Sequence, residues 1–180
     1  MTLTAARRTQ LLRAAREAIE HALAGKTPRP KPSGPPSVAH GGIFVSLHLR
    51  ANHELRGCIG SMEACEPLAD TVAEAAVAAA TRDRRFAPLR LEELPLVEIQ
   101  ISLLEPLRPV RPDEVQVGAD GLLVRDGKHS GLLLPQVAVE HGWDRETFLR
   151  MTCRKAGVAE DAWRRSDCVL LAFRAEVFGE

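Results

Sequence analysis

The sequence contains no tyrosine and few other aromatic residues, with five phenylalanines and two tryptophans among 180 residues. Proteins that hold single-stranded nucleic acids stack bases on aromatic side chains, and this chain is poorly supplied with them. It also has no excess of one charge, because 24 lysines and arginines balance 24 aspartates and glutamates. We therefore expect neither nucleic acid nor an anionic membrane surface as a partner.

Long apolar runs are absent as well. The longest, around residues 75–80, is short and rich in alanine, so no membrane-spanning helix is predicted. Residues 2–24 carry four arginines but lack the apolar stretch of a secretory signal peptide. A mitochondrial presequence is also disfavoured, because Glu17 and Glu20 interrupt the basic segment and the segment fits a packed helix. The expected location is the cytoplasm.

The spacing of the four cysteines excludes the common metal and redox motifs. Cys58, Cys65, Cys153 and Cys168 form no C-x-x-C pair and no Cys/His cluster with the spacing of structural zinc. No H-x-x-x-H motif or pair of carboxylates at ligand spacing occurs either. The sequence therefore predicts no metal site, names no cofactor and favours free thiols.

Hydrophobic periodicity predicts an α+β fold, with a mainly antiparallel sheet and flanking helices, in one domain over residues 1–180. Helices are expected at the N-terminus up to Gly25, at about 66–82, at 135–141 and from Asp144 to Gly157, and strands at 43–50, 55–58, 97–103, 121–125, 131–134 and 169–175. Five prolines between Pro28 and Pro36 predict an extended arm. We expect residues 1–40 to pack on the domain, and a homodimer is also compatible with them.

The segment Leu55–Ser61, with the sequence LRGCIGS, is the most informative part of the chain. Residues two apart on a strand share a face, so Arg56 and Cys58 are expected to project together. A nearby cation favours the thiolate, which is the reactive form of cysteine. Gly57 and Gly60 leave the backbone bare, as a close-approaching ligand or strand requires. This segment is therefore a candidate site.

Four segments together resemble the AMMECR-type domain family, also catalogued as protein A of the AmmeMemoRadiSam system. These are LRGCIGS at 55–61, DRRFAPL at 83–89, SGLLLPQVAVEHGWD at 130–144 and FLRMTCRKAG at 148–157. The resemblance covers nearly the whole chain. It implies a single α+β unit with a larger and a smaller lobe around an antiparallel sheet. It also implies Memo-like and radical-SAM proteins as partners, but no established activity.

The resemblance places the family's cysteine motif on residues 56–60 and its second cysteine on Cys153. Two positions depart from the family pattern or vary within it. Arg84 stands where members often carry proline, and His129 lies at a position that is expected to vary. A role for His129 is therefore not carried over from the family.

Two interpretations of Cys58 remain open. It is a nucleophile or redox thiol beside Arg56, or it is a small residue packed in a tight strand crossing. A nucleophilic cysteine needs a base within hydrogen-bond reach. His129 is our first choice, in the stretch Gly127–Gly131, among the candidates His40, His48, His53, His129 and His141.

Three further residues complete the candidate site, each with a purely structural alternative. Cys153 is a second site thiol, or a buried residue of its helix; a redox pair with Cys58 requires Cα atoms within about 7 Å. Arg85 clamps an anionic substrate, or belongs to a solvated helix end. Gln136 lines a pocket, or caps a helix start.

Two functions follow from these alternatives, and the sequence does not decide between them. The first is a cysteine-dependent enzyme or catalytic subunit that acts through Cys58, with Arg56 holding the thiolate or an anion. The second is a non-catalytic adaptor for the Memo-like and radical-SAM proteins. A catalytic Cys58 must be reachable from solvent, whereas an adaptor can bury it.

Overall fold

A computed structural model describes residues 3–26, 41–62 and 67–180 of the chain. It divides into two compact units, one of residues 1–103 and 176–180 and the other of residues 104–175. The proline-rich arm, His40 and Cys65 lie outside the described residues. The expectation of a single domain over 1–180 stays a prediction.

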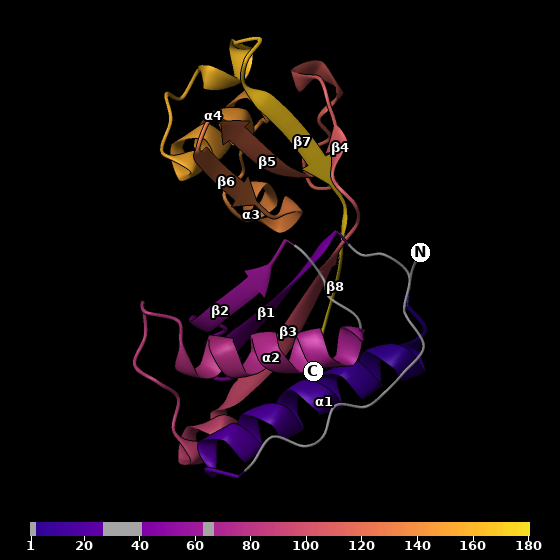
Figure 1. Cartoon of the computed structure of the whole chain (residues 1–180), viewed down its shortest axis with the longest axis vertical. Coiled ribbons are helices and arrows are strands. Elements are labelled where there is room, and N and C mark those ends of the chain that lie inside the picture. The colour runs from indigo at the N-terminus through magenta and orange to yellow at the C-terminus, as the bar shows by residue number, and fades with distance from the viewer. Residues whose placement is uncertain (1–2, 27–40, 63–66) are drawn as a thin grey trace. The chain divides into compact units, whose positions relative to one another are not determined.

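The larger unit contains a four-stranded sheet in the order β2-β1-β3-β8 (Figure 1). Its elements are α1 (Ala5–Leu23), β1 (Gly42–Leu49), β2 (Leu55–Ser61), α2 (Leu68–Thr81), the short helix η1 (Leu91–Leu96), β3 (Val97–Leu104) and β8 (Ala175–Gly179). Strands β1 and β2 form an antiparallel hairpin. Because β2 lies at the end of the sheet, one side of its backbone has no neighbouring strand among the described residues.

Both long helices of this unit cover the same face of the sheet (Figure 1). Alternation explains the core, since every second residue of a strand points to one face. The side chains that are fully buried between helices and sheet include Leu11, Ala15 and Ile19 of α1, Ile43, Val45 and Leu47 of β1, and Val97, Ile99 and Ile101 of β3. The residues between them, such as Ser46 of β1, therefore lie on the opposite face.

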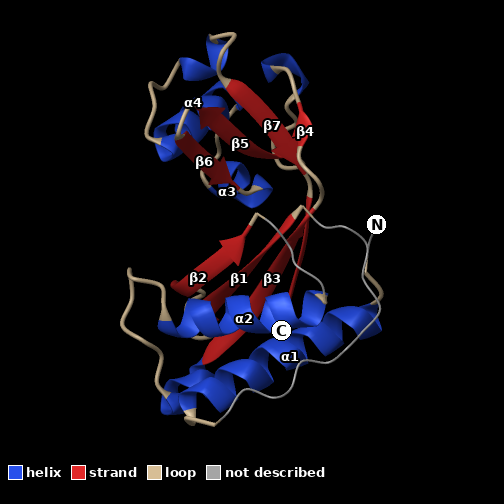
Figure 2. Cartoon of the chain, viewed as in Figure 1, coloured by secondary structure: helices blue, strands red, loops and turns tan. Residues whose placement is uncertain are grey.

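The smaller unit contains the sheet β4-β7-β5-β6, and Figure 2 shows its helices and strands in separate colours. Its elements are β4 (Arg108–Pro109), η2 (Pro112–Glu114), β5 (Gly121–Asp126), β6 (His129–Leu133), α3 (Pro135–Glu140), α4 (Arg145–Ala156), η3 (Ala162–Arg164) and β7 (Val169–Phe173). β5 pairs with both β6 and β7, and each pairing is antiparallel. Its core gathers around Phe148, Leu122 and Cys153, which are fully buried.

The predicted α+β class is confirmed, with antiparallel pairing and flanking helices. The strand predicted at 169–175 is present as β7, but it ends at Phe173, and Ala175 already begins β8, which belongs to the other sheet. The hairpin turn follows Asp126, with Gly127 at φ +57°. In the part of the chain that the structure describes, no helix combines the length and apolar character needed to cross a bilayer.

Candidate functional site

Cys58 lies in the middle of β2, half-buried, on the sheet face opposite the helices. It pairs directly with Ser46 of β1. Its backbone N–H donates to Asp83 at 2.8 Å on the open side of the strand, so this is a pair without mutual backbone hydrogen bonds. In such pairs the Cα atoms approach most closely, to about 4.5 Å, and the side chains meet.

The Ser46 hydroxyl reaches the thiol as this register requires. Ser46 Oγ lies 3.2 Å from Cys58 Sγ and is placed to donate its proton to the sulfur. Ser46 is only 8% exposed, so its hydroxyl is held in a largely dry environment. A hydroxyl that donates to sulfur stabilises the thiolate relative to the thiol.

The loop after α2 supplies a carboxylate and a guanidinium to the same place. Arg85 donates to Asp83 through Nε at 3.0 Å and through Nη2 at 2.7 Å. Nη2 also lies 3.5 Å from the carbonyl oxygen of Cys58. The hydrogen bonds from the Arg85 side chain hold the pKa of Asp83 well below its ordinary value of 3.8, although burial opposes the effect.

Arg85 remains charged and partly open to solvent. Its hydrogen bond to Asp83 raises the pKa of the guanidinium, desolvation lowers it, and the negative charges of Asp83 and of a Cys58 thiolate add smaller upward effects. Its side chain is 58% exposed. Nη1 donates to no acceptor among the described residues, so one edge of the guanidinium is available to an anion.

Arg56 makes its contacts elsewhere on this edge. Its guanidinium donates to the carbonyl oxygen of Ala87 at 2.9 Å and to Glu93 at 3.4 Å. The register of β1 and β2 shifts between Leu47 and His48, which leaves Arg56 as the extra residue of a bulge. The predicted role of Arg56 at the thiol stays a prediction, and Arg85 is the guanidinium that contacts Cys58.

The two glycines of the segment are sites of close packing within the protein. A Cβ on Gly57 would lie 2.3 Å from the carbonyl oxygen of Ala79 in α2. A Cβ on Gly60 would lie 2.2 Å from the carbonyl oxygen of Ile43 and 2.4 Å from the Phe44 ring. These contacts account for both glycines, and a substrate-binding role for them stays a prediction.

The other predicted site residues belong to the smaller unit. His129 is exposed at the start of β6, Gln136 is half-buried in the first turn of α3, and Cys153 is fully buried in α4. The structure thus brings Cys58 and Arg85 together within one unit. Pairing of these three residues with Cys58 stays a prediction.

Cys153 has the environment of a packed thiol. Burial raises its pKa, although a hydrogen bond from the backbone N–H of Trp163 opposes the effect. Burial also raises the pKa of Cys168, which packs at the edge of the same core. At neutral pH both thiols are therefore protonated and poorly nucleophilic.

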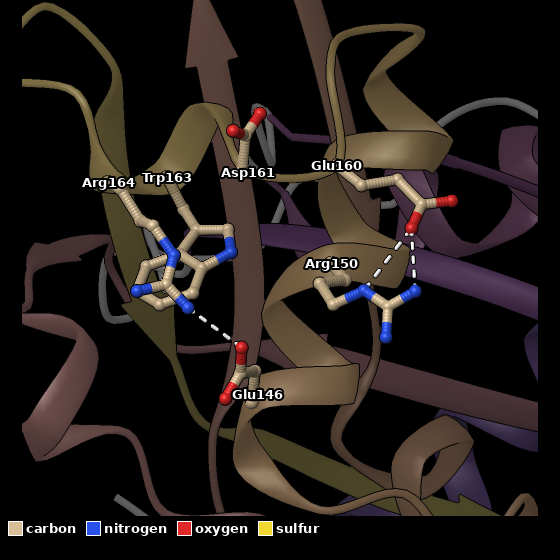
Figure 3. Close-up of a pocket in the computed structure, with 6 residues that line it drawn as sticks. All are labelled: Glu146, Arg150, Glu160, Asp161, Trp163 and Arg164. Carbon is tan, nitrogen blue, oxygen red and sulfur yellow. Dashed lines mark hydrogen bonds and ion pairs between the residues drawn. The ribbon is translucent and has the colours of Figure 1, made fainter.

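A surface hollow of about 310 Å³ lies in the smaller unit, lined by Glu146, Arg150, Glu160, Asp161, Trp163 and Arg164 (Figure 3). Its two arginines are already paired. Arg150 donates to Glu160 at 2.8 Å, whereas Arg164 donates to Glu146 at 2.7 Å and stacks over the Trp163 ring at 4.1 Å. The hollow contains no thiol or hydroxyl nucleophile, so we do not place the chemistry there.

Reasoning from the sequence missed Ser46 and Asp83. Ser46 carries no signal of its own, because only the strand register places it opposite Cys58. Asp83 opens the segment DRRFAPL, whose charge run we interpreted as a solvated helix end with only Arg85 as a candidate. Among residues 3–26, 41–62 and 67–180, no three His, Cys, Asp or Glu side chains gather closely enough to hold a metal ion.

The chain resembles known proteins over nearly its whole length. The AMMECR1 family model matches residues 12–178. A protein from Thermofilum pendens is 43% identical over 94% of this chain and 88% of its own length, and one from Thermococcus gammatolerans is 44% identical over the same shares. The crystal structure of the uncharacterized protein PH0010 from Pyrococcus horikoshii superposes with a TM-score of 0.86 at 42% identity, covering 95% of this chain and 90% of that one. The chain therefore belongs to the AMMECR1 family.

Proposed function

We propose that this protein is a cysteine-dependent enzyme, or the catalytic subunit of one, and that Cys58 is its nucleophile. The observation that carries the proposal is the contact of 3.2 Å between Ser46 Oγ and Cys58 Sγ, on a cysteine that is only half-buried. A hydroxyl donor and a nearby guanidinium both stabilise a thiolate. No comparable donor set surrounds the described thiols of the smaller unit, where burial dominates.

Arg85 supports an anionic substrate for this site. Its Nε and Nη2 are held by Asp83, which fixes the plane of the guanidinium, while Nη1 faces no protein acceptor among the described residues. A planar guanidinium with free donors binds a carboxylate or phosphate. The proposed substrate therefore carries such a group close to its electrophilic atom. We retain Memo-like and radical-SAM proteins as the proposed partners, and a cytoplasmic location.

The alkylation rate of each cysteine tests the nucleophile directly. Native protein at pH 7 is treated with iodoacetamide, and peptide mass spectrometry follows every cysteine separately. We expect Cys58 to react fastest and the Arg85→Gln variant to react several-fold more slowly at Cys58. Cys168→Ser serves as the matched control and should leave the Cys58 rate unchanged. If Cys58 reacts only after unfolding, the proposal is wrong.

A second candidate function is a non-catalytic adaptor for the same partners. It is favoured by the observation that Arg56, Gly57 and Asp83 all make contacts within the protein: Arg56 and Asp83 at the edge of β2, and Gly57 against α2. Co-purification of the native chain with the two partner proteins tests this function, with Cys58→Ala as the variant. An adaptor keeps its partners and its cellular role in this variant, whereas an enzyme keeps only the partners.

A further inference from the structure

His48 lies near the end of β1, on the sheet face that carries Ser46 and Cys58. Its neighbours Leu47 and Leu49 pack into the core beneath the helices, so His48 points to the opposite side. It follows Ser46 by two positions on the same strand, which separates the two Cα atoms by about 7 Å. The imidazole therefore belongs to the surroundings of the candidate nucleophile.

One hydrogen bond defines the tautomer of this imidazole. Nδ1 of His48 lies 3.1 Å from the carbonyl oxygen of His53. A carbonyl oxygen only accepts, so Nδ1 carries a proton, and in the neutral imidazole Nε2 then presents a lone pair. The carbonyl is itself held in place, because His53 adopts φ +58° in the hairpin turn and its ring lies 2.6 Å from Glu98 Oε1.

The lone pair of His48 Nε2 accepts no hydrogen bond from the residues that the structure describes. Nε2 of His48 is buried and has no hydrogen-bond partner among the described residues. An unsatisfied buried acceptor is unfavourable, and folded proteins rarely keep one without a structural or functional reason. A half-buried imidazole with a fixed tautomer and a buried, unpaired Nε2 has the form of a general base.

We propose that His48 is the base of the Cys58 site, an inference that rests on the proposed function. The thiol proton of Cys58 passes to Nε2 of His48, and the Ser46 hydroxyl, which donates to the sulfur, stabilises the thiolate that forms. The products are a thiolate, an intact hydroxyl and an imidazolium, so the one proton is conserved. Catalytic hydrogen bonds often tighten when substrate binds. A hydroxyl or water then completes the path from Cys58 Sγ to His48 Nε2. His48 is one of the five candidate bases named from the sequence, and we prefer it to His129, the first choice there.

Two variants separate a base from a merely structural imidazole. Asparagine at position 48 places an amide where Nδ1 lies and keeps a donor for the His53 carbonyl, whereas glutamine places its amide near Nε2. Neither can take up a proton. We expect both His48→Asn and His48→Gln to slow alkylation of Cys58 at pH 7 by roughly a hundredfold, a typical loss for a missing general base. His21→Gln, in α1, is the matched control.

Nuclear magnetic resonance of ¹⁵N-histidine-labelled protein reads the tautomer without reference to reactivity. We expect the His48 signals of a protonated Nδ1 and a bare Nε2 at pH 7. A protonated Nε2 overturns the inference. So does a His48→Asn variant that alkylates at the wild-type rate, because the ring then acts only through His53. If Cys58 of the wild-type protein is itself unreactive, the proposed function fails first and this inference fails with it.

Discussion

The carboxylate of Asp83 accepts a hydrogen bond from the backbone N–H of Cys58 at 2.8 Å. The contact joins the segments LRGCIGS and DRRFAPL through two residues that are 25 positions apart in the chain. A corresponding contact joins the other two family segments, because a Cβ on Gly131 of β6 would lie 2.2 Å from the backbone nitrogen of Ala156 in α4. The recognisable segments therefore meet in pairs, one pair in each unit.

Asp83→Asn is expected to destabilise the protein by about 2 kcal/mol at pH 7, because charge-assisted hydrogen bonds are lost from a buried position. The pKa of Asp83 is depressed in the folded state, so its contribution is fully present above its ordinary value of 3.8 and is lost as the pH falls toward the folded value. Urea unfolding at pH 7 and pH 3 measures the difference between wild type and variant. That difference should shrink at pH 3; a constant difference would contradict the assigned pKa shift.

Ser46→Ala is expected to slow alkylation of Cys58 by roughly tenfold at pH 7, because the thiolate loses a hydrogen bond from a neutral donor. The measurement is the second-order rate constant with iodoacetamide at the Cys58 peptide. Ser130→Ala, an exposed serine on β6, controls for general effects of serine removal. An unchanged rate would mean that the contact of 3.2 Å is packing without chemical consequence.

Gly57→Ala is expected to lower the stability by about 1–3 kcal/mol, since an added methyl group overpacks the strand against α2. The obstructing atom is the carbonyl oxygen of Ala79, at 2.3 Å from the ideal Cβ position. Ala79→Gly cannot relieve a clash with a backbone atom, so the double variant should be no more stable than Gly57→Ala. Thermal unfolding measures all three, with Ala51→Ser in the exposed turn as the control. A variant as stable as the wild type would refute this packing.

Cys153 is expected to resist iodoacetamide in the native protein and to react only upon unfolding. It is 0% exposed, and burial raises its pKa, so both access and thiolate fraction are small. Labelling across a urea series, followed at the Cys153 peptide, should coincide with the loss of circular dichroism. Native labelling at a rate close to that of Cys58 would instead support the predicted role of Cys153 as a second site thiol.

Much of the local structure could be predicted from the sequence, because its signals act over a few residues. Asp144 caps α4 by accepting from the Thr147 N–H at 2.8 Å, and Gly157 ends the helix at φ +75°. Alternation in β3 likewise predicts its strand and buried face. The break between β7 and β8 escaped prediction, since both strands read as one apolar run although they enter different sheets.

The sequence by itself determined the α+β class, the helix ends and the family, because periodicity, capping and motif spacing are local properties of the chain. Only the tertiary structure decided which side chains surround Cys58. Ser46 reaches the thiol through strand register, and Arg85 arrives from the loop after α2. Arg56, the nearest cation in the sequence, turns to Ala87 and Glu93 instead. Such contacts depend on how distant segments pack, and local periodicity carries no information about that packing.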